Sequence, residues 1–495
     1  MAGQQPTATT AQGTVTGKLI LHGSQKAFLG LPYATPPTGE LRWRPPQPPA
    51  AWKGVREATQ FGGRCEQYHV WNDYIFLDPG PTEDCLYLNV YVPASSKGTG
   101  KLPVMVWIHG GGFIAGAGSE PRYTNSALVS KGVVLVTMNY RLGVFGFLAS
   151  DGLAKEAGGH AGNYGLMDMA AALRWVKANI AAFGGDPGNV TIFGESAGSF
   201  AVNALTAAPE AHGLFQKFIG ESGAFFGATI PMNSLAEREH RDQAWIESLG
   251  AKNIEELRKL PAEKVLEGQK KAGAGFFPVV DGRFLTESVP ETYAAGRQMH
   301  VPGMIGWNRD ERAGTLSKDM TAAKWKTYAA EHYGDHAKEF LAAFPADNDD
   351  QAVRSADDLT TAGFIALGAW KWAEADAKDG RAPVYRYRFD RPAPPEENHP
   401  QGKYAFHSDE LEFVFGTLDV RRGAVWQPED RKLSGEMIAY WTNFARTGDP
   451  NGEGLPHWAR YDKDGVVLHF NEPITAGPDS SRPEFEFLVN GPQPH

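Results

Sequence analysis

The sequence has few of the features that mark membrane proteins or nucleic-acid-binding proteins. Its longest purely apolar runs, such as Val133 to Val136, are far too short to span a bilayer. Acidic residues outnumber basic ones by 58 to 48, so the net charge is −10, and lysine and arginine form no block beyond short pieces such as Arg421-Arg422. We therefore expect no membrane span and no nucleic-acid partner.

Cysteine is scarce as well, since Cys65 and Cys85 are the only two in 495 residues. They enclose a polar and aromatic segment, 66–84, and a bridge closing it would contribute about 3 kcal/mol by restricting the unfolded chain. By spacing alone, two free thiols remain the alternative. A bridge indicates an oxidising compartment, so we expect a secreted or periplasmic protein whose signal peptide has been removed, or a cytoplasmic protein if the thiols are free.

Repeats and long low-complexity stretches, which would separate domains, are also missing. The length would allow two or three domains, but proline and glycine clusters are spread along the chain as turns. With 42% hydrophobic residues the chain can bury a large core. We therefore assign residues 13–490 to one large domain with long excursions.

Apolar periodicity predicts the class of fold. Nearly continuous apolar runs are typical of strands covered by helices on both faces, and apolar residues three and four apart are typical of helices. Strands are predicted at 28–34, 41–46, 85–92, 104–108, 133–138, 218–219, 303–306 and 384–389. Helices are predicted at 167–180 and 433–446 and within excursions at 233–272 and 322–372. This order predicts an α/β fold with a doubly wound, mostly parallel sheet.

One stretch carries the strongest chemical signal, the run Val190-Thr-Ile-Phe-Gly-Glu-Ser-Ala-Gly-Ser199. Four strand-forming residues precede a Gly-x-Ser-x-Gly motif, and small residues suited to a helix follow it. This order is typical of a nucleophile elbow, in which a serine sits on a tight strand-to-helix turn and the flanking glycines prevent clashes. Ser196 is therefore the candidate nucleophile, although a serine in an ordinary turn shows the same spacing.

A glycine-rich turn upstream supplies candidate hydrogen-bond donors. His109-Gly-Gly-Gly-Phe113 follows a predicted strand, and three consecutive glycines leave backbone N–H groups open toward a ligand. The N–H groups of Gly111 and Gly112 would join that of Ala197, the residue after the nucleophile, to stabilise the oxyanion of a tetrahedral intermediate. A plain glycine-rich turn is the alternative.

A serine nucleophile needs a base, and the base needs an acid that orients it. Among 14 histidines, His407 lies in a loop just ahead of an apolar run, where a base is expected, and His399 in a turn before a proline is its competitor. The loop after the predicted strand at 303–306 offers two acids, Asp310 and Glu311. The residues alone do not separate these two carboxylates.

These motifs, together with five others, resemble those of the type-B carboxylesterases of the α/β-hydrolase superfamily, a group that includes the cholinesterases. The similarity runs from about residue 30 to about residue 461 and keeps the family's order. The seven motifs are Gly30-Leu-Pro-Tyr-Ala-Thr-Pro-Pro37, Glu83-Asp-Cys-Leu-Tyr-Leu-Asn89, His109-Gly-Gly-Gly-Phe113, Asn139-Tyr-Arg-Leu-Gly143, Phe183-Gly-Gly-Asp-Pro187, Gly194-Glu-Ser-Ala-Gly198 and Tyr440-Trp-Thr-Asn-Phe444.

The resemblance implies the α/β-hydrolase fold and a role for each residue that matches a family motif. It implies Ser196 as nucleophile, Glu311 rather than Asp310 as acid, and His407 as base. It also implies three oxyanion donors, the N–H groups of Gly111, Gly112 and Ala197.

The resemblance further implies residues that surround the triad. Ser222 matches a family serine that supports the catalytic histidine, and Glu195, beside the nucleophile, belongs to the same surrounding layer. The two cysteines match the family's first disulfide. Arg312 and Ser408 stand where the family commonly has glycine, next to the acid and the base, so local backbone geometry and substrate polarity are expected to differ here.

The sequence therefore predicts a serine carboxylesterase that hydrolyses small-molecule esters, including esters of bulky alcohols or xenobiotics, through an acyl-enzyme. We expect a monomer that needs no metal and no cofactor. Two alternatives remain: amide or thioester hydrolysis by the same residues, and a non-catalytic adhesion protein, which in this family has a broken triad. Aromatic residues of segment 66–84, including Trp71, either line the mouth of the site or pack within the loop, and the spacing of Trp71 from Cys65 does not support choline specificity.

Overall fold

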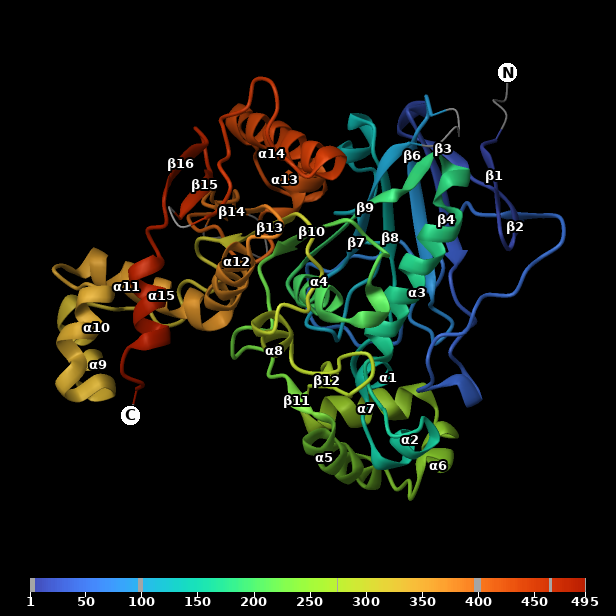
Figure 1. Ribbon diagram of the computed structural model, residues 1–495, viewed down its shortest axis with the longest axis horizontal. Helices are drawn as coiled ribbons and strands as arrows, with labels where there is room; N and C mark the ends of the chain where they lie inside the picture. Colours follow the sequence, from blue (N-terminus) through green and yellow to red (C-terminus); the bar gives the residue numbers. More distant parts are fainter. Residues whose placement is uncertain (1–4, 97–100, 274, 396–401, 463–464, 495) are drawn as a thin grey trace.

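The computed structural model describes residues 5–96, 101–273, 275–395, 402–462 and 465–494. Its centre is a twisted sheet of 11 strands with helices on both faces (Figure 1). In spatial order these strands are β16 (Thr475–Pro478), β15 (Val466–Phe470), β14 (Val384–Phe389), β13 (Gly303–Asn308), β10 (Lys217–Glu221), β9 (Gly185–Glu195), β7 (Leu102–Ile108), β8 (Val134–Met138), β6 (Tyr87–Pro93), β4 (Gln25–Pro32) and β3 (Lys18–Ile20). A three-stranded sheet near the N-terminus contains β1 (Thr7–Thr10), β2 (Gly13–Thr16) and β5 (Val55–Glu57).

The direction of the strands confirms the predicted fold class. Neighbouring strands from β8 to β15 run parallel, whereas β6, β4 and β3 at one margin and β16 at the other pair antiparallel. The predicted strands at 85–92, 104–108, 133–138 and 384–389 correspond to β6, β7, β8 and β14. The strand predicted at 41–46 is wrong, because this proline-rich piece forms turns after a short 3-10 helix, Gly39–Leu41.

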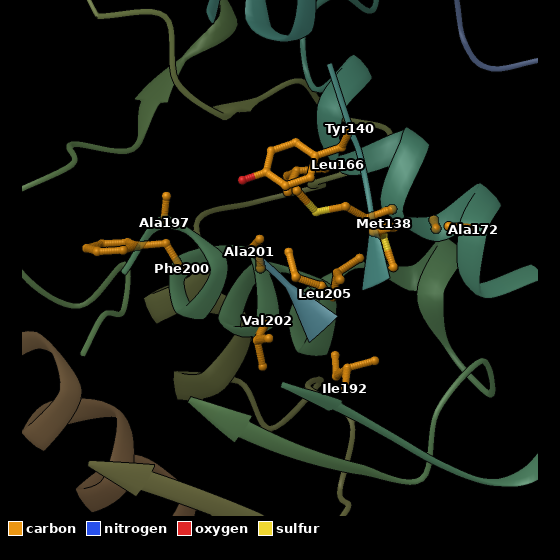
Figure 2. Close-up of a cluster of buried hydrophobic side chains, with 14 of the residues drawn as sticks. Met138, Tyr140, Leu166, Ala172, Ile192, Ala197, Phe200, Ala201, Val202 and Leu205 are labelled. Atoms are coloured by element: carbon orange, nitrogen blue, oxygen red, sulfur yellow. The ribbon is translucent and has the colours of Figure 1, made fainter. Parts of the chain in front are cut away.

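The two faces of the sheet pack against different helices, and successive side chains of β7 point alternately into the two resulting clusters. Val104, Val106 and Ile108 join an apolar cluster with α3 (Tyr164–Asn179) and α4 (Ala197–Ala207). Met105 and Trp107 point the other way, into a cluster with α13 (Leu411–Phe415) and α14 (Pro428–Thr447). Figure 2 shows the first cluster, where side chains of α3, α4, β8 and β9 meet. Burial on both faces explains why these strands are apolar throughout.

Two groups of helices extend from this core, at the predicted excursions. One contains α5 (Leu235–Ser248), α6 (Ile254–Arg258) and α7 (Ala262–Ala272), next to α1 (Gly143–Phe147) and α2 (Asp151–Glu156) (Figure 1). The other contains α9 (Ala322–Tyr333), α10 (Ala337–Ala343) and α11 (Asp349–Thr361), which share a small apolar core with α15 (Arg482–Asn490). The chain enters the second group after α8 (Val289–Ala294) and β13. It returns to the sheet through a π-helical segment, Ala362–Ala366, and α12 (Leu367–Asp379). In the part of the chain that the structure describes, no helix has the length and apolar character needed to cross a membrane.

Candidate active site

Ser196 lies on the turn between β9 and α4, as the Gly-x-Ser-x-Gly motif predicts. Its φ of +54° and ψ of −125° are a strained conformation for a residue that has a side chain. A Cβ at Gly198 would lie 2.0 Å from the carbonyl oxygen of Ile108 at the end of β7, and one at Gly194 would lie 2.6 Å from the same oxygen. Because neither position accepts a side chain, the two glycines allow α4 to begin directly against the sheet with Ser196 at the turn.

Three side chains from distant parts of the chain form a hydrogen-bonded series. His407 Nε2 lies 2.9 Å from Ser196 Oγ, and His407 Nδ1 lies 2.6 Å from Glu311 Oε2. Ser196 follows β9, Glu311 follows β13, and His407 lies in the loop before α13. The Glu311 side chain is fully buried, whereas 24% of the His407 side chain is exposed. These distances are those of a serine, a base that can take its proton and an acid that orients the base.

Glu311 and not Asp310 faces the imidazole of His407. The Asp310 carboxylate instead accepts a hydrogen bond from the N–H of Ala405 at 3.0 Å and pairs with Arg354 of α11 at 2.5 Å. The N–H of Asp310 also donates to the carbonyl oxygen of Ala405 at 3.0 Å. Asp310 thus ties the loop of Glu311 to the loop of His407, a contact that the sequence did not indicate.

Two further donors hold the Glu311 carboxylate in place. Ser222 Oγ lies 2.5 Å from Glu311 Oε1, and the N–H of Asn308 donates to the same oxygen at 2.7 Å. Ser222 therefore contacts the acid, and it reaches His407 only through that carboxylate. The sequence analysis missed Asn308. The available signal was a polar residue close after the predicted apolar strand at 303–306, and the structure buries that residue completely.

Glu195 approaches His407 from another direction. Its Oε1 lies 3.2 Å from His407 Nε2 and accepts a hydrogen bond of 2.6 Å from Ser408 Oγ. Ser408 has a φ of +70°, which explains why glycine is expected at this position. A serine here accepts that backbone strain, and its hydroxyl fixes the carboxylate beside the base.

The charges around His407 determine when its imidazole is neutral. Burial alone would lower its pKa, but the carboxylates of Glu195 and Glu311 outweigh burial and raise the pKa of His407 to about 9. Burial raises the pKa of Glu195, and the neighbouring imidazolium and the Ser408 hydroxyl oppose that shift. An imidazole accepts the serine proton only when it is neutral, so this arrangement favours activity at alkaline pH.

The glycine-rich turn after β7 lies beside Ser196. Gly111 has a φ of +98°, and a Cβ there would lie 2.1 Å from the carbonyl oxygen of Ala115, so only glycine fits. Among the described residues, the N–H groups of Gly111 and Gly112 donate no hydrogen bond to another protein group. Both residues line the same cavity as Ser196 and Ala197. The turn and the N-terminus of α4 thus offer backbone donors next to the serine hydroxyl, as an oxyanion hole requires.

Two expectations from the sequence, the competing histidine and the absence of a metal requirement, are not tested by the structure. The competing histidine, His399, lies outside the described residues. Within the described ranges, no group of three or more His, Cys, Asp or Glu side chains is arranged to hold a metal ion.

Comparison with known proteins places this geometry in a family. The sequence model of the carboxylesterase family matches residues 4–487. The chain is 37% identical to the para-nitrobenzyl esterase of Bacillus subtilis (strain 168), over 98% of this chain and 99% of that protein. It is also 37% identical to the fumonisin B1 esterase of Sphingopyxis macrogoltabida, over 94% of this chain and 87% of that protein.

The chain belongs to the carboxylesterase family. A solved PNB esterase superposes with a TM-score of 0.81 at 34% identity, covering 98% of this chain and 100% of that one. A thermophilic PNB esterase superposes with a TM-score of 0.83 at 35% identity, with the same coverage. These similarities confirm the α/β-hydrolase fold and make the chain a carboxylic-ester hydrolase.

In this carboxylesterase the serine opens into a cavity of about 790 Å³. Most of the wall is apolar. Its side chains come from segment 66–84, the glycine-rich turn after β7, α4, the loop after β10, the segment after α7, the end of the second helical excursion and the segments on either side of α13. The apolar side chains are Trp71, Tyr74, Ile75, Ile114, Phe200, Ile230, Phe277, Phe364, Ile365, Phe406 and Val420. A cavity of this size and character suits an organic ester larger than a simple acetate.

The disulfide holds one wall of the cavity. Cys65 and Cys85 are bridged, which confirms the predicted pairing. Trp71 and Tyr74 of the enclosed segment line the cavity, and the Tyr74 hydroxyl lies 3.2 Å from the point where a Cβ of Gly111 would stand. Phe76 instead packs under the guanidinium of Arg64 at 4.6 Å. Aromatic residues of this segment therefore both line the cavity and pack within the loop region, the two possibilities that the sequence left open.

Proposed function

We propose that this protein cleaves carboxylic esters through an acyl-enzyme formed on Ser196. The observation that carries the proposal is the hydrogen-bonded series from Ser196 through His407 to Glu311 at the edge of an apolar cavity. His407 takes the serine proton as the hydroxyl attacks the ester carbonyl, and then gives it to the departing alcohol. Water, activated by the same imidazole, releases the acid and restores the serine.

We assign the remaining polar groups to this cycle as follows. The N–H groups of Gly111, Gly112 and Ala197 bind the oxyanion of each tetrahedral intermediate. Glu311 keeps His407 in the tautomer that presents a lone pair to the serine and stabilises the imidazolium that forms. Ser222 and Glu195 keep the acid and the base in position, because each contacts one of them directly.

The size of the cavity and its aromatic wall support bulky or xenobiotic esters as substrates. Relatives named for large substrates, the fumonisin B1 esterase and a human cocaine esterase that is 35% identical over 94% of this chain, support the same reading. Amide or thioester substrates would use the same residues, but no separate feature of the site favours them.

We further propose one domain over residues 13–490, active as a monomer and located in an oxidising compartment. A sheet that extends from β3 to β16, with α15 packed against the last excursion, supports the single domain. The bridge between Cys65 and Cys85 supports a secreted or periplasmic location. Size-exclusion chromatography with light scattering tests the oligomeric state.

A substrate panel tests the proposed function. We expect the purified protein to hydrolyse 4-nitrophenyl esters graded by acyl length, and aryl-alkyl esters graded by alcohol bulk, much faster than matched anilides and thioesters. The Ser196→Ala variant, purified in parallel, should lose this activity by a factor of about 10⁴ or more. Unchanged turnover in that variant, or no turnover of any ester by the natural chain, would overturn the proposal.

A further inference from the structure

The cavity beside Ser196 is lined by charged as well as apolar side chains, and most of those charges are paired. Its six carboxylates come from Asp73, Glu120, Glu195, Glu311, Asp409 and Glu412. Each has a basic side chain within 4 Å: Arg122 serves the first two, His407 the next two and Arg421 the last two. Each of the six carboxylates thus has a basic partner, and each of the three basic side chains is shared by two of them.

Two arginines of the same cavity have no such partner. Arg312 and Arg422 both line it and are exposed to solvent, and neither forms an ion pair with any described residue. In a chain whose net charge is −10, two unmatched cations at one cavity are not explained by the general charge of the surface. Their position indicates a negative group on the molecule that enters.

Arg312 lies beside the triad and contacts one aromatic ring. Its guanidinium lies over the ring of Phe364 at 4.7 Å, and the same ring also contacts His407, whose ring centre is 5.1 Å away in an edge-on arrangement. Its carbonyl oxygen accepts a hydrogen bond of 3.0 Å from Thr315 Oγ1, which anchors the main chain. The guanidinium is therefore separated from the catalytic imidazole by one phenyl ring.

This stacking leaves the recognition groups of the guanidinium free. A guanidinium donates through N–H groups in its own plane, so covering one face with Phe364 does not block them. The planar fork matches a carboxylate with two parallel hydrogen bonds, and partial desolvation by the ring strengthens them. A carboxylate a few bonds from the ester carbonyl can reach this position while the carbonyl is at Ser196.

We infer that this carboxylesterase prefers esters that carry a carboxylate, and that Arg312, assisted by Arg422, binds that group. The inference rests on the proposed function and names its substrate class. The carboxylate belongs either to the acyl part, as in a half-ester of a dicarboxylic acid, or to the alcohol part, as in an ester of a hydroxy acid. The chemistry of recognition is the same for both.

Matched substrate pairs test the preference. On the acyl side, mono-4-nitrophenyl glutarate is compared with its uncharged amide, 4-nitrophenyl 4-carbamoylbutanoate; on the alcohol side, 4-acetoxybenzoate is compared with 4-acetoxybenzamide. For at least one pair, kcat/KM should favour the anion by about fivefold or more at low ionic strength, and the ratio should fall toward one as salt is added. The pair that responds identifies which part of the ester carries the carboxylate.

Charge variants connect this ratio to the arginine. We expect Arg312→Gln to lower the anion-to-neutral ratio by about fivefold to tenfold, Arg312→Glu to invert it, Arg312→Lys to keep part of it, and Arg422→Gln to have a smaller effect. Arg56→Gln is the matched control, because Arg56 is also exposed and also lies over an aromatic ring, that of Trp52 at 5.4 Å, but is not part of the cavity. A ratio near one for both pairs in the natural chain, or a ratio that Arg312→Glu leaves unchanged, would overturn the inference.

Binding separates this inference from the proposed function. The Ser196→Ala protein is titrated by calorimetry with 4-acetamidobenzoate and with 4-acetamidobenzamide, which differ only in the charge. Tighter binding of the anion, lost when Arg312→Gln is added, supports the inference even if the natural protein hydrolyses no ester. Equal binding of the two compounds counts against the inference even if the natural protein hydrolyses esters.

Discussion

If His407 is the base, as proposed, removing the negative charge beside its imidazole by Glu195→Gln should move the pH dependence of catalysis to lower pH. Glu195 Oε1 lies 3.2 Å from His407 Nε2, so its charge stabilises the imidazolium, which cannot accept the serine proton. Glutamine has nearly the same shape, and its carbonyl oxygen can still accept the hydrogen bond from Ser408. The substitution therefore removes charge while keeping the local packing.

The magnitude follows from the distance and the surroundings. Two unit charges 3.2 Å apart interact by about 5 kcal/mol at an effective dielectric constant of about 20, which corresponds to about four pKa units as an upper bound. Partial exposure of His407 and the raised pKa of Glu195 both reduce this effect. We therefore expect the pKa of His407, which the two carboxylates raise to about 9, to fall by about one to two units.

The assay is kcat/KM for a neutral ester between about pH 5.5 and pH 10, followed at the isosbestic wavelength of the product, because kcat/KM reports the ionisation of the free enzyme. Activity of the natural protein should rise as His407 loses its proton toward pH 9 and should be lost as the pH falls. In Glu195→Gln the same limb should lie about one to two units lower, with the alkaline plateau reduced by less than about tenfold.

A neighbouring glutamate supplies the control. Glu221 is buried, which raises its pKa to about 8, and it accepts a hydrogen bond of 2.8 Å from Trp441 rather than contacting His407. Because its carboxylate does not contact the imidazole, Glu221→Gln should move the limb much less than Glu195→Gln does. A limb that stays fixed or moves to higher pH in Glu195→Gln, or one that moves equally in Glu221→Gln, would refute the electrostatic argument.

Three other perturbations have defined outcomes. A fluorophosphonate should label the protein once, on Ser196. Ser196→Ala, His407→Ala and the double variant should each lower turnover by about 10⁴ to 10⁶, to similar residual levels, because the two residues act as a unit. A double variant whose loss is the product of the single losses would contradict this assignment. Replacing both cysteines by serine should lower the free energy of unfolding by about 3 kcal/mol, because the bridge closes a loop with a sequence separation of 20, and a denaturation midpoint that does not move would exclude this contribution. Arg354→Met should lower the free energy of unfolding by about 1–3 kcal/mol and should reduce kcat more than it changes KM. The reason is that the buried Asp310 carboxylate keeps its ion pair with Arg309 but loses the one with Arg354 of α11. Adding Asp310→Asn should recover part of the lost stability, and a purely additive loss would show that Asp310 and Arg354 are not coupled.

Local chemistry was readable from the sequence where a motif imposes its own geometry. The elbow is such a case, because the strained φ of Ser196 and the close approach of Gly194 and Gly198 to Ile108 require those residue types in that order. Strands such as β7 and β8 were readable because helices on both faces demand apolar residues throughout. The prediction failed in a proline-rich segment, where 41–46 was predicted as a strand and forms turns, because proline lacks the N–H that a strand ladder needs.

The contacts between distant segments were decided only by the tertiary structure. Asp310 and Glu311 are adjacent carboxylates on one turn, and only the family resemblance, not their own residues, favoured Glu311. Glu311 meets His407 because the loops after β13 and before α13 lie side by side, while Asp310 meets Arg354 of α11. The contact between Ser408 and Glu195 and the stacking of Arg312 on Phe364 have the same origin. A sequence records which residue types a local backbone can accept, whereas the partner of a buried charge depends on which segments the long-range packing of the sheet and its excursions brings within a few ångströms.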